Sequence, residues 1–223
     1  EFLKWLVFNK ITICDLSTRL GELLFENNYR EGLCLRHVKV GGEKLTRLPK
    51  SFWGCVITNT YGPTETTIEA LDCKVYDKGK VLFPKVDNIP IGKSLLNYDI
   101  YVLDRNLNPC PIGTPGELYI GGTGLARGYL NQEELTKERF ISNPFAKELG
   151  LESTDRIYKT GDLVRWLPDG NIEYLGRTDF QVKIRGFRIE LGEIQNVLAK
   201  HKNISQVSVI DKEKEGQKYL VAY

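Results

Sequence analysis

Thr64 and Glu65 follow a Gly-Pro turn in the segment NTYGPTETT, residues 59–67, and both have side chains that could take part in chemistry. A hydroxyl beside a carboxylate suits a phosphate oxygen and a Mg²⁺ ion bridging to it, because Mg²⁺ prefers oxygen ligands shared with substrate phosphates. Tyr61 adds an aromatic face for a base or a small substrate. An ordinary turn with an exposed acid is an equally good interpretation.

Asp162 and Arg177 lie in a second segment of this kind, YKTGDLVRWLPDGNIEYLGR, residues 158–177. An acid at the entry of a strand is a natural acceptor for two ribose hydroxyls, and an arginine can pair with the same sugar or with a phosphate. The alternative is a surface Asp-Arg pair, which contributes little to stability. Three strand-end loops each carry a polar group suited to a different part of ATP, and this accumulation favours a nucleotide site.

Two glycine-rich segments are weaker candidates. GELYIGGTGLARGYL, residues 116–130, carries Arg127 but lacks the G-x-x-x-x-G-K-[ST] pattern of a phosphate loop, so we predict a close-packed structural turn there. Gly41-Gly42-Glu43, after a predicted strand, is either a site of close backbone approach or simply a turn.

The elements that would position these residues follow from hydrophobic periodicity. A strand over 11–16, a helix over 17–28 and strands ending near residues 42 and 61 predict an α/β part. Open α/β sheets bind ligands at the carboxyl ends of their strands, where the polar loops lie. From 70 to 120 short strands alternate with turns, which predicts a distorted β-barrel or antiparallel sheet.

The remainder of the chain predicts a helix, a hairpin and a small unit. The helix is expected at EELTKERF with Asn131 as its cap, and residues 143–156 are expected to form a loop. The hairpin turns at residues 168–170, in the sequence Pro-Asp-Gly. The small unit would contain a strand, an amphipathic helix and two more strands, at residues 180–186, 191–202, 205–210 and 218–223.

The composition argues against several classes of function. The 31 basic and 29 acidic residues give a net charge of +2, which favours neither nucleic acid nor a membrane surface as a partner. Five cysteines without a C-x-x-C pair indicate neither a disulfide framework nor a thiolate metal site, so a cytoplasmic location fits. Two histidines leave little scope for a histidine metal centre. The absence of methionine leads us to expect a piece of a longer protein.

Four strings, in this order and spacing, resemble the core motifs of the adenylate-forming superfamily: NTYGPTET, GELYIGGTGLARGYLN, YKTGDL and GRTDFQVKIRGFRIELGEI. Within it they most resemble the adenylation domains of nonribosomal peptide synthetases, over roughly residues 36–195. The resemblance implies an α/β fold plus a β-barrel-like subdomain, followed by the start of a small α+β lid. Residues 1–178 would be the C-terminal portion of the large ATP- and substrate-binding domain, and residues 179–223 the start of the lid domain.

The resemblance also implies an activity in two steps. An amino acid carboxylate attacks the α-phosphorus of ATP, releasing pyrophosphate and leaving an aminoacyl-adenylate. The phosphopantetheine thiol of a partner peptidyl carrier domain then takes the acyl group. Mg²⁺ and a neighbouring condensation domain are further expected partners. The phosphate-gripping loop and the terminal lysine of the family have no counterpart in these 223 residues, so we expect no useful adenylation rate from this chain by itself.

Individual roles follow from the resemblance. Thr64 would contact the phosphate and Glu65 would hold Mg²⁺. Lys183 would lie with Gly186 on the loop that moves in for thioester formation, and Asp179 would be the hinge. The residues expected to bind the nucleotide are Gly42, Glu43, Asn59, Tyr61, Thr64, Asp162, Tyr174 and Arg177, with Asn59 and Tyr61 at the adenine and Asp162 at the ribose.

The acyl pocket implied by the resemblance has a charged lining, which indicates an amino acid with a polar or ionisable side chain. Charges buried around an aliphatic substrate would be desolvated without compensation. The pocket residues would be Arg19, Lys39, Gly41, Thr60, Ile68 and Glu69. An alignment before residue 36 that is off by one or more positions, or charges that pair among themselves, are the alternatives.

Three other interpretations share these motifs. An acyl-coenzyme A ligase or a stand-alone amino-acid:carrier-protein ligase would belong to the same superfamily, whereas a degenerate nucleotide-binding domain would keep the fold without the chemistry. LARGYLN and the segment at 158–177 favour the peptide-synthetase branch. The residue types at Thr64, Glu65 and Asp162 are those that the chemistry requires.

Overall fold

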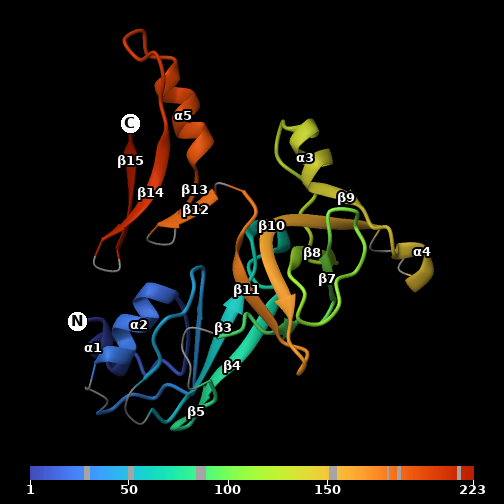
Figure 1. Cartoon of the computed structure of the whole chain (residues 1–223). Coiled ribbons are helices and arrows are strands. Elements are labelled where there is room, and N and C mark those ends of the chain that lie inside the picture. The colour runs from blue at the N-terminus through green and yellow to red at the C-terminus, as the bar shows by residue number, and fades with distance from the viewer. Residues whose placement is uncertain are drawn as a thin grey trace. The chain divides into compact units, whose positions relative to one another are not determined.

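The chain divides into two compact units, Glu1–Gly176 and Arg177–Tyr223, in the computed structural model shown in Figure 1. Residues 1–27, 31–49, 53–83, 89–150, 155–179, 181–184, 187–214 and 217–223 are described.

The first unit begins with a six-stranded sheet in the order β1-β2-β3-β4-β5, with β6 paired to β4. The pairs β1/β2 and β2/β3 are parallel, whereas β4 runs antiparallel to β3. The strands are β1 (Ile13–Ser17), β2 (His37–Gly41), β3 (Val56–Tyr61), β4 (Leu71–Asp77), β5 (Lys80–Val81) and β6 (Lys93–Ser94). The predicted α/β part is confirmed, and β4, β5 and β6 are antiparallel strands within the stretch 70–120 where short strands were expected.

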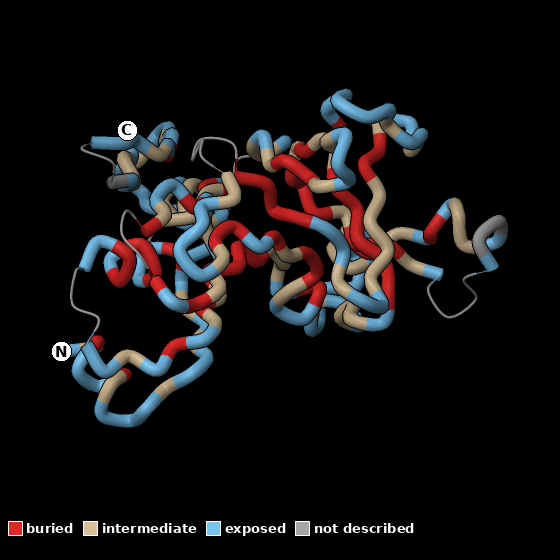
Figure 2. The backbone as a smooth tube through the Cα atoms, turned by 90° about the horizontal axis from the view of Figure 1, so that it is seen from below, coloured by how far each residue is buried: buried red, intermediate tan, exposed pale blue. Residues whose placement is uncertain are grey.

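Two helices, α1 (Phe2–Phe8) and α2 (Thr18–Glu26), pack against this sheet. Leu24 and Phe25 of α2 join Val38 and Val40 of β2 in one buried cluster, to which α1 contributes Leu6. Helix α1 was not predicted from the sequence. It has only seven residues, of which two are buried, so its apolar pattern is short. Buried residues gather in the strands, as the red tube in Figure 2 shows.

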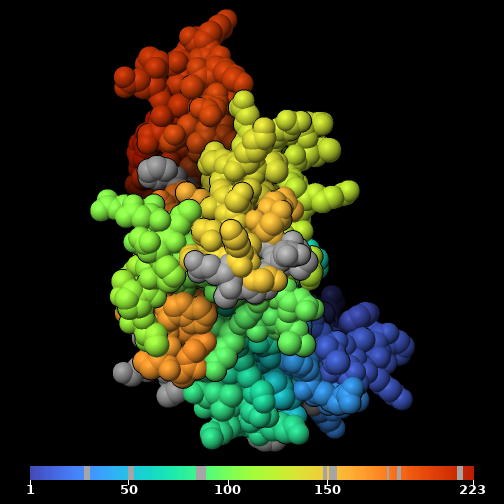
Figure 3. Space-filling model, turned by 90° about the vertical axis from the view of Figure 1, so that its right-hand side faces the viewer, coloured from blue at the N-terminus to red at the C-terminus, as the bar shows by residue number. Residues whose placement is uncertain are grey.

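A five-stranded antiparallel sheet completes the first unit, in the order β11-β10-β8-β7, with β9 paired to β10. Its strands are β7 (Tyr98–Leu103), β8 (Gly116–Gly122), β9 (Phe140–Ser142), β10 (Arg156–Trp166) and β11 (Ile172–Arg177). In Figure 3, green atoms of the part of the chain that contains β7 lie beside orange and yellow atoms from later in the chain, and β10 contacts both β7 and β8. The predicted hairpin at residues 168–170 is confirmed as the connection between β10 and β11.

Two predictions around the short helices were wrong. Helix α3 (Glu133–Arg139) begins after Gln132 as its N-cap, whereas Asn131 has a φ of 55° and does not occupy the cap position. A second helix, α4 (Ala146–Leu149), lies in a stretch expected to be a loop. Gly150 ends it at a φ of 63°, so one helical turn fits before the glycine stops the helix.

The second unit contains two β-hairpins and one helix. Strands β12 (Gln181–Ile184) and β13 (Phe187–Glu190) form one antiparallel pair, and β14 (Val209–Lys214) and β15 (Gln217–Ala222) form another. Helix α5 (Leu191–Ala199) packs against β14. The predicted first strand, helix and last strand are confirmed, and β13 is an additional strand. The strand predicted at residues 205–210 was misplaced, because β14 begins only at Val209 and continues to Lys214. Among the described residues, no helix of either unit has the length and apolar character of a membrane span.

The two sheets of the first unit are joined at Gly92. Its carbonyl oxygen accepts the N–H of Ile172 at 2.8 Å, and the Ile172 carbonyl accepts the N–H of Ile91 at 2.8 Å. The φ of Gly92 is 102°, and a Cβ atom there would lie 1.7 Å from the Asp72 carbonyl oxygen. The connection therefore requires a residue without a side chain.

We expect Gly92→Ala to lower the free energy of unfolding by about 3–5 kcal/mol, because strained backbone and steric overlap add together. Gly113→Ala is the matched control, since Gly113 also has a positive φ of 84° but would meet nothing within 4 Å. Its expected effect is about 1 kcal/mol. Urea denaturation of the 223-residue chain measures both. Equal shifts of the two midpoints would contradict the close approach at Gly92.

Candidate active site

A pocket of about 610 Å³ opens at the carboxyl ends of the three parallel strands β1, β2 and β3. This is the edge at which open α/β sheets bind ligands. The lining residues come from the ends of these strands and from the loop after β3: Asp15, Leu16, Ser17, Gly41, Gly42, Thr60, Gly62, Thr64, Thr67, Ile68 and Glu69.

Most of the predicted acyl-pocket residues lie in this lining, together with two from the predicted phosphate and nucleotide sets. They are Gly41, Gly42, Thr60, Thr64, Ile68 and Glu69. Two predicted residues do not line the pocket. Arg19 lies in the first turn of α2, beyond the end of β1, and is exposed, whereas Lys39 lies on β2, two residues before Gly41. Asp15 takes a place in the lining that the sequence analysis did not assign.

Asp15, Lys39 and Glu69 form a charged group at the pocket. Asp15 and Lys39 are cross-strand neighbours in the β1/β2 register, and Lys39 Nζ lies 2.7 Å from Glu69 Oε2. Partial burial and the nearby Glu69 carboxylate raise the pKa of Asp15. The hydrogen bond to Glu69 raises the pKa of Lys39. The predicted alternative that these charges pair among themselves is therefore confirmed for Lys39 and Glu69.

The loop after β3 has an unusual backbone where it borders the pocket. Thr67 and Ile68 have φ values of 55° and 77°. β-Branched residues rarely adopt such angles, and strained backbone of this kind clusters at functional sites. Gly62 makes the conformation possible, because a Cβ atom there would lie 2.4 Å from the Ile68 carbonyl oxygen.

The glycine-rich segment around residues 121–130 holds this loop from the other side. Thr67 Oγ1 donates to the Gly124 carbonyl at 2.7 Å, and the Ala126 N–H donates to the Glu65 carbonyl at 2.8 Å. A Cβ atom on Gly124 would lie 2.0 Å from the hydroxyl oxygen of Tyr98. The close-packed structural turn predicted for this segment is confirmed.

Glu65 is buried, with only 6% of its surface exposed, in the short 3₁₀ helix η1 (Thr64–Thr66). The Tyr129 hydroxyl donates to Glu65 Oε1 at 2.6 Å, and burial together with this hydrogen bond raises the pKa of Tyr129. Over the described ranges, no group of three His, Cys, Asp or Glu side chains is arranged to hold a metal ion by itself. Glu65 therefore offers a single, positioned carboxylate.

Asp162 lies in the middle of β10, not at the entry of a strand as predicted. The β8/β10 register shifts between Lys159 and Leu163, and Gly161 has a φ of 76° at this irregularity. A bulge of this kind redirects a side chain without ending the strand. The Tyr61 hydroxyl donates a hydrogen bond to Asp162, and burial and the Asp162 carboxylate raise the pKa of Tyr61.

Three other predicted nucleotide residues, Tyr174, Asn59 and Glu43, have different surroundings. Tyr174 in β11 lies near enough to Tyr61 to contribute to its raised pKa. Asn59 is buried, and its Nδ2 donates to the Pro90 carbonyl at 2.9 Å, so this donor is used within the fold. Glu43 is fixed through its backbone, because Thr18 Oγ1 donates to the Glu43 carbonyl at 3.0 Å.

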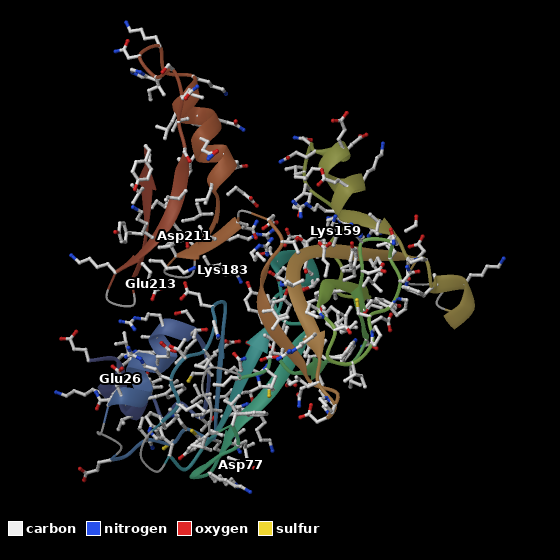
Figure 4. The ribbon with its side chains drawn as sticks, viewed as in Figure 1. Glu26, Asp77, Lys159, Lys183, Asp211 and Glu213 are labelled. Atoms are coloured by element: carbon white, nitrogen blue, oxygen red, sulfur yellow. The ribbon has the colours of Figure 1, made fainter. Side chains whose placement is uncertain are left out.

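In the second unit, Arg177, predicted to help bind the ribose, forms an ion pair with Asp179, the predicted hinge. Arg177 Nε donates to Asp179 Oδ1, and a terminal guanidinium nitrogen donates to Oδ2, both at 2.7 Å. Lys183 is a correction, because it lies on strand β12 opposite Arg188 and not on a loop (Figure 4). Gly186 lies outside the described residues.

We expect the Tyr61–Asp162 contact to contribute a coupling energy of about 1–2 kcal/mol in a double-mutant cycle of Tyr61→Phe and Asp162→Asn. A hydrogen bond to a buried carboxylate is stronger than one between neutral groups, which is the reason for this size. Urea denaturation of the single and double variants measures the coupling. Tyr98→Phe with Asp162→Asn is the control and should be additive, because the Tyr98 hydroxyl donates to the Thr66 carbonyl instead. Additivity in both cycles would contradict the contact.

Comparison with known proteins identifies the family of the chain. The AMP-binding enzyme family profile matches residues 1–130. The chain is 56% identical to bacitracin synthase 2 of Bacillus licheniformis over 75% of its length, and 45% identical to gramicidin S synthase 2 of Brevibacillus brevis over 99%. It spans only 6% and 5% of the lengths of these two relatives.

Solved structures of peptide synthetases have the same fold. NpsA-ThdA, an artificially fused adenylation-PCP di-domain from Klebsiella oxytoca, matches 99% of this chain, which covers 44% of it, with a TM-score of 0.81 and 28% identity. A four-domain nonribosomal peptide synthetase bound to AMP and glycine matches 100% of this chain, which covers 16% of it, with a TM-score of 0.63 and 34% identity. The chain therefore belongs to the AMP-binding enzyme family, among the adenylation domains of nonribosomal peptide synthetases.

Proposed function

We propose that the protein carrying this chain uses ATP to activate an amino acid carboxylate as an aminoacyl-adenylate. The acyl group then passes to the phosphopantetheine thiol of a peptidyl carrier domain. One observation carries this proposal: the last two residues of β3 serve two sites at once, since Thr60 lines the pocket and Tyr61 donates to Asp162. Successive strand residues point to opposite faces, so one strand end can place an acyl pocket beside a nucleotide contact.

The named relatives support the same chemistry. Bacitracin synthase and gramicidin S synthase are peptide synthetases, and one solved neighbour is bound to AMP and glycine. Another joins an adenylation domain to a carrier domain. An amino acid, a nucleotide and a carrier are therefore the partners we propose for this chain, with a condensation domain as a neighbour and a cytoplasmic location.

On the nucleotide side, we assign the ribose to Asp162. Its carboxylate accepts from the Tyr61 hydroxyl, and two carboxylate oxygens can together accept several hydrogen bonds, including those of two sugar hydroxyls. The exposed Thr64 hydroxyl in the pocket wall would donate to an oxygen of the α-phosphate. Gly42, with a φ of 98° and no atom within 4 Å of an added Cβ, leaves room for close approach by the adenosine edge.

Mg²⁺ fits this site as an ion shared with the substrate. It typically takes one or two protein carboxylates and completes its shell with phosphate oxygens and water, and Glu65 offers one such carboxylate. When bound, the ion would neutralise charge on the phosphates. Tyr129 would orient Glu65 through its hydroxyl.

The assignment of residues 1–178 to the large domain and 179–223 to the start of the lid is also part of the proposal. Arg177 and Asp179 lie at this boundary, and their paired side chains give the connecting segment a defined local structure. Asp179 remains our choice for the hinge, with Lys183 in the part that moves.

We expect Asp162→Asn, in the full-length protein, to lower kcat/KM for ATP by roughly 10–100-fold, the equivalent of one charged hydrogen bond. ATP–pyrophosphate exchange at saturating amino acid measures this. Asp169→Asn is the matched control, because Asp169 is an exposed acid in the turn of the same hairpin and accepts from Asn171 instead. A wild-type KM for ATP in Asp162→Asn would overturn the assignment of the ribose to this residue.

A further inference from the structure

We propose that the pocket selects an amino acid whose long side chain ends in a cation, an ammonium or a guanidinium. This inference rests on the proposed function and names the class of amino acid it would use. It is carried by the side chains of Asp15, Lys39 and Glu69, by the shape of the pocket around them, and by their position on the sheet.

The first step is the charge of the pocket. Asp15 and Glu69 line it, and Lys39 reaches Glu69 from β2. These three side chains carry a net negative charge when all are ionised. The Glu69 side chain is only 14% exposed and Lys39 is 33% exposed, so solvent screens this pair incompletely, whereas Asp15 is exposed at the mouth of the pocket. One further positive charge would neutralise the group.

The second step concerns the repulsion between the two acids. Asp15 and Glu69 both line the pocket and both neighbour Lys39, and two nearby carboxylates repel each other when both are ionised. Lys39 compensates one of them. A substrate cation placed at Asp15 would give each carboxylate a positive partner.

Other side chains fit less well. An aliphatic side chain would desolvate the acids without a new partner, and an acidic one would add a third negative charge. A neutral amide or hydroxyl could donate to Asp15, but it would leave the excess negative charge of the three ionised side chains uncompensated. These alternatives are outcomes of the experiment below.

The distance across the sheet between Asp15 and the nucleotide contact sets the length of the substrate side chain. The acids and the nucleotide contact lie on different strands, because Asp15 is on β1 whereas Tyr61, which holds Asp162, is on β3. The order β1-β2-β3 separates them by two strand spacings, roughly 10 Å. Gly41 lies between them on β2 and carries no side chain to fill the space. A substrate that reacts near β3 and ends at β1 therefore needs a stem of several methylenes.

Gly41 is constrained as well as small. A Cβ atom there would lie 2.4 Å from Thr60 Oγ1 and 2.8 Å from the Thr60 carbonyl oxygen. No other residue fits at this position without moving β3. The open path from Thr60 towards Asp15 is therefore built into the packing of the two strands.

Substrate preference tests the proposal on the unaltered full-length protein. We expect ATP–pyrophosphate exchange with lysine, ornithine or arginine to exceed exchange with norleucine by at least 100-fold in kcat/KM. Norleucine is the matched comparison, because it keeps the lysine stem and lacks the ammonium. Glutamine, glutamate and leucine complete the panel.

The possible results distinguish failure of the cationic assignment from failure of the proposed amino acid activation. A preference for norleucine, leucine, glutamine or glutamate overturns the cationic assignment and leaves amino acid activation in place. Exchange with none of the twenty standard amino acids or ornithine, under conditions where a relative such as gramicidin S synthase 2 exchanges, overturns the proposed function itself and the assignment with it.

Variants then test the two acids. Asp15→Asn and Glu69→Gln should each raise KM for the preferred cationic amino acid at least 10-fold, while KM for ATP stays within twofold of wild type. A merely structural role would change both constants or neither. Asp77→Asn is the control, because Asp77 pairs with Val56 at the opposite end of β3 from the pocket and should change neither constant (Figure 4). Unchanged amino acid KM in both acid variants would overturn the proposal.

Discussion

The hydrogen bond from Tyr61 to Asp162 is the interaction on which the rest of the site depends. It joins residues 101 positions apart, one at the end of a strand in the six-stranded sheet and one at a bulge in the five-stranded sheet. The bulge at Gly161 is what directs Asp162 away from the regular ladder. This contact links the strand that lines the acyl pocket directly to Asp162, the proposed ribose ligand.

The remaining features hold the loop after β3 in a strained conformation beside that contact. Thr67 and Ile68 adopt positive φ angles, and the glycine-rich segment fixes them through Gly124 and Ala126. Strain of this kind persists only where the surroundings over-determine the backbone. Glu65 gains its position from the same arrangement, since Tyr129 belongs to the segment that holds the loop.

The sequence predicted the elements better than the exact placement of the site. Periodicity located β1 to β4, α2 and the hairpin of β10 and β11, because their apolar residues face one core. It missed α1, whose apolar pattern is too short to distinguish. The T-G-D string reads as the start of a strand, whereas Leu163 resumes pairing with β8 and makes Gly161 a bulge. Asp15 was missed because only the pairing of β1 with β2 brings it beside Lys39.

The central claim is that one strand end, at Thr60 and Tyr61, joins an amino acid pocket to a nucleotide site. A crystal structure of the full-length protein with a non-hydrolysable aminoacyl-adenylate analogue tests it most directly. The account predicts ribose hydroxyls within about 3.2 Å of the Asp162 carboxylate and the amino acid side chain in the pocket lined by Gly41, Thr60 and Glu69. An analogue whose ribose lies away from Asp162, or whose side chain lies outside that pocket, would contradict it.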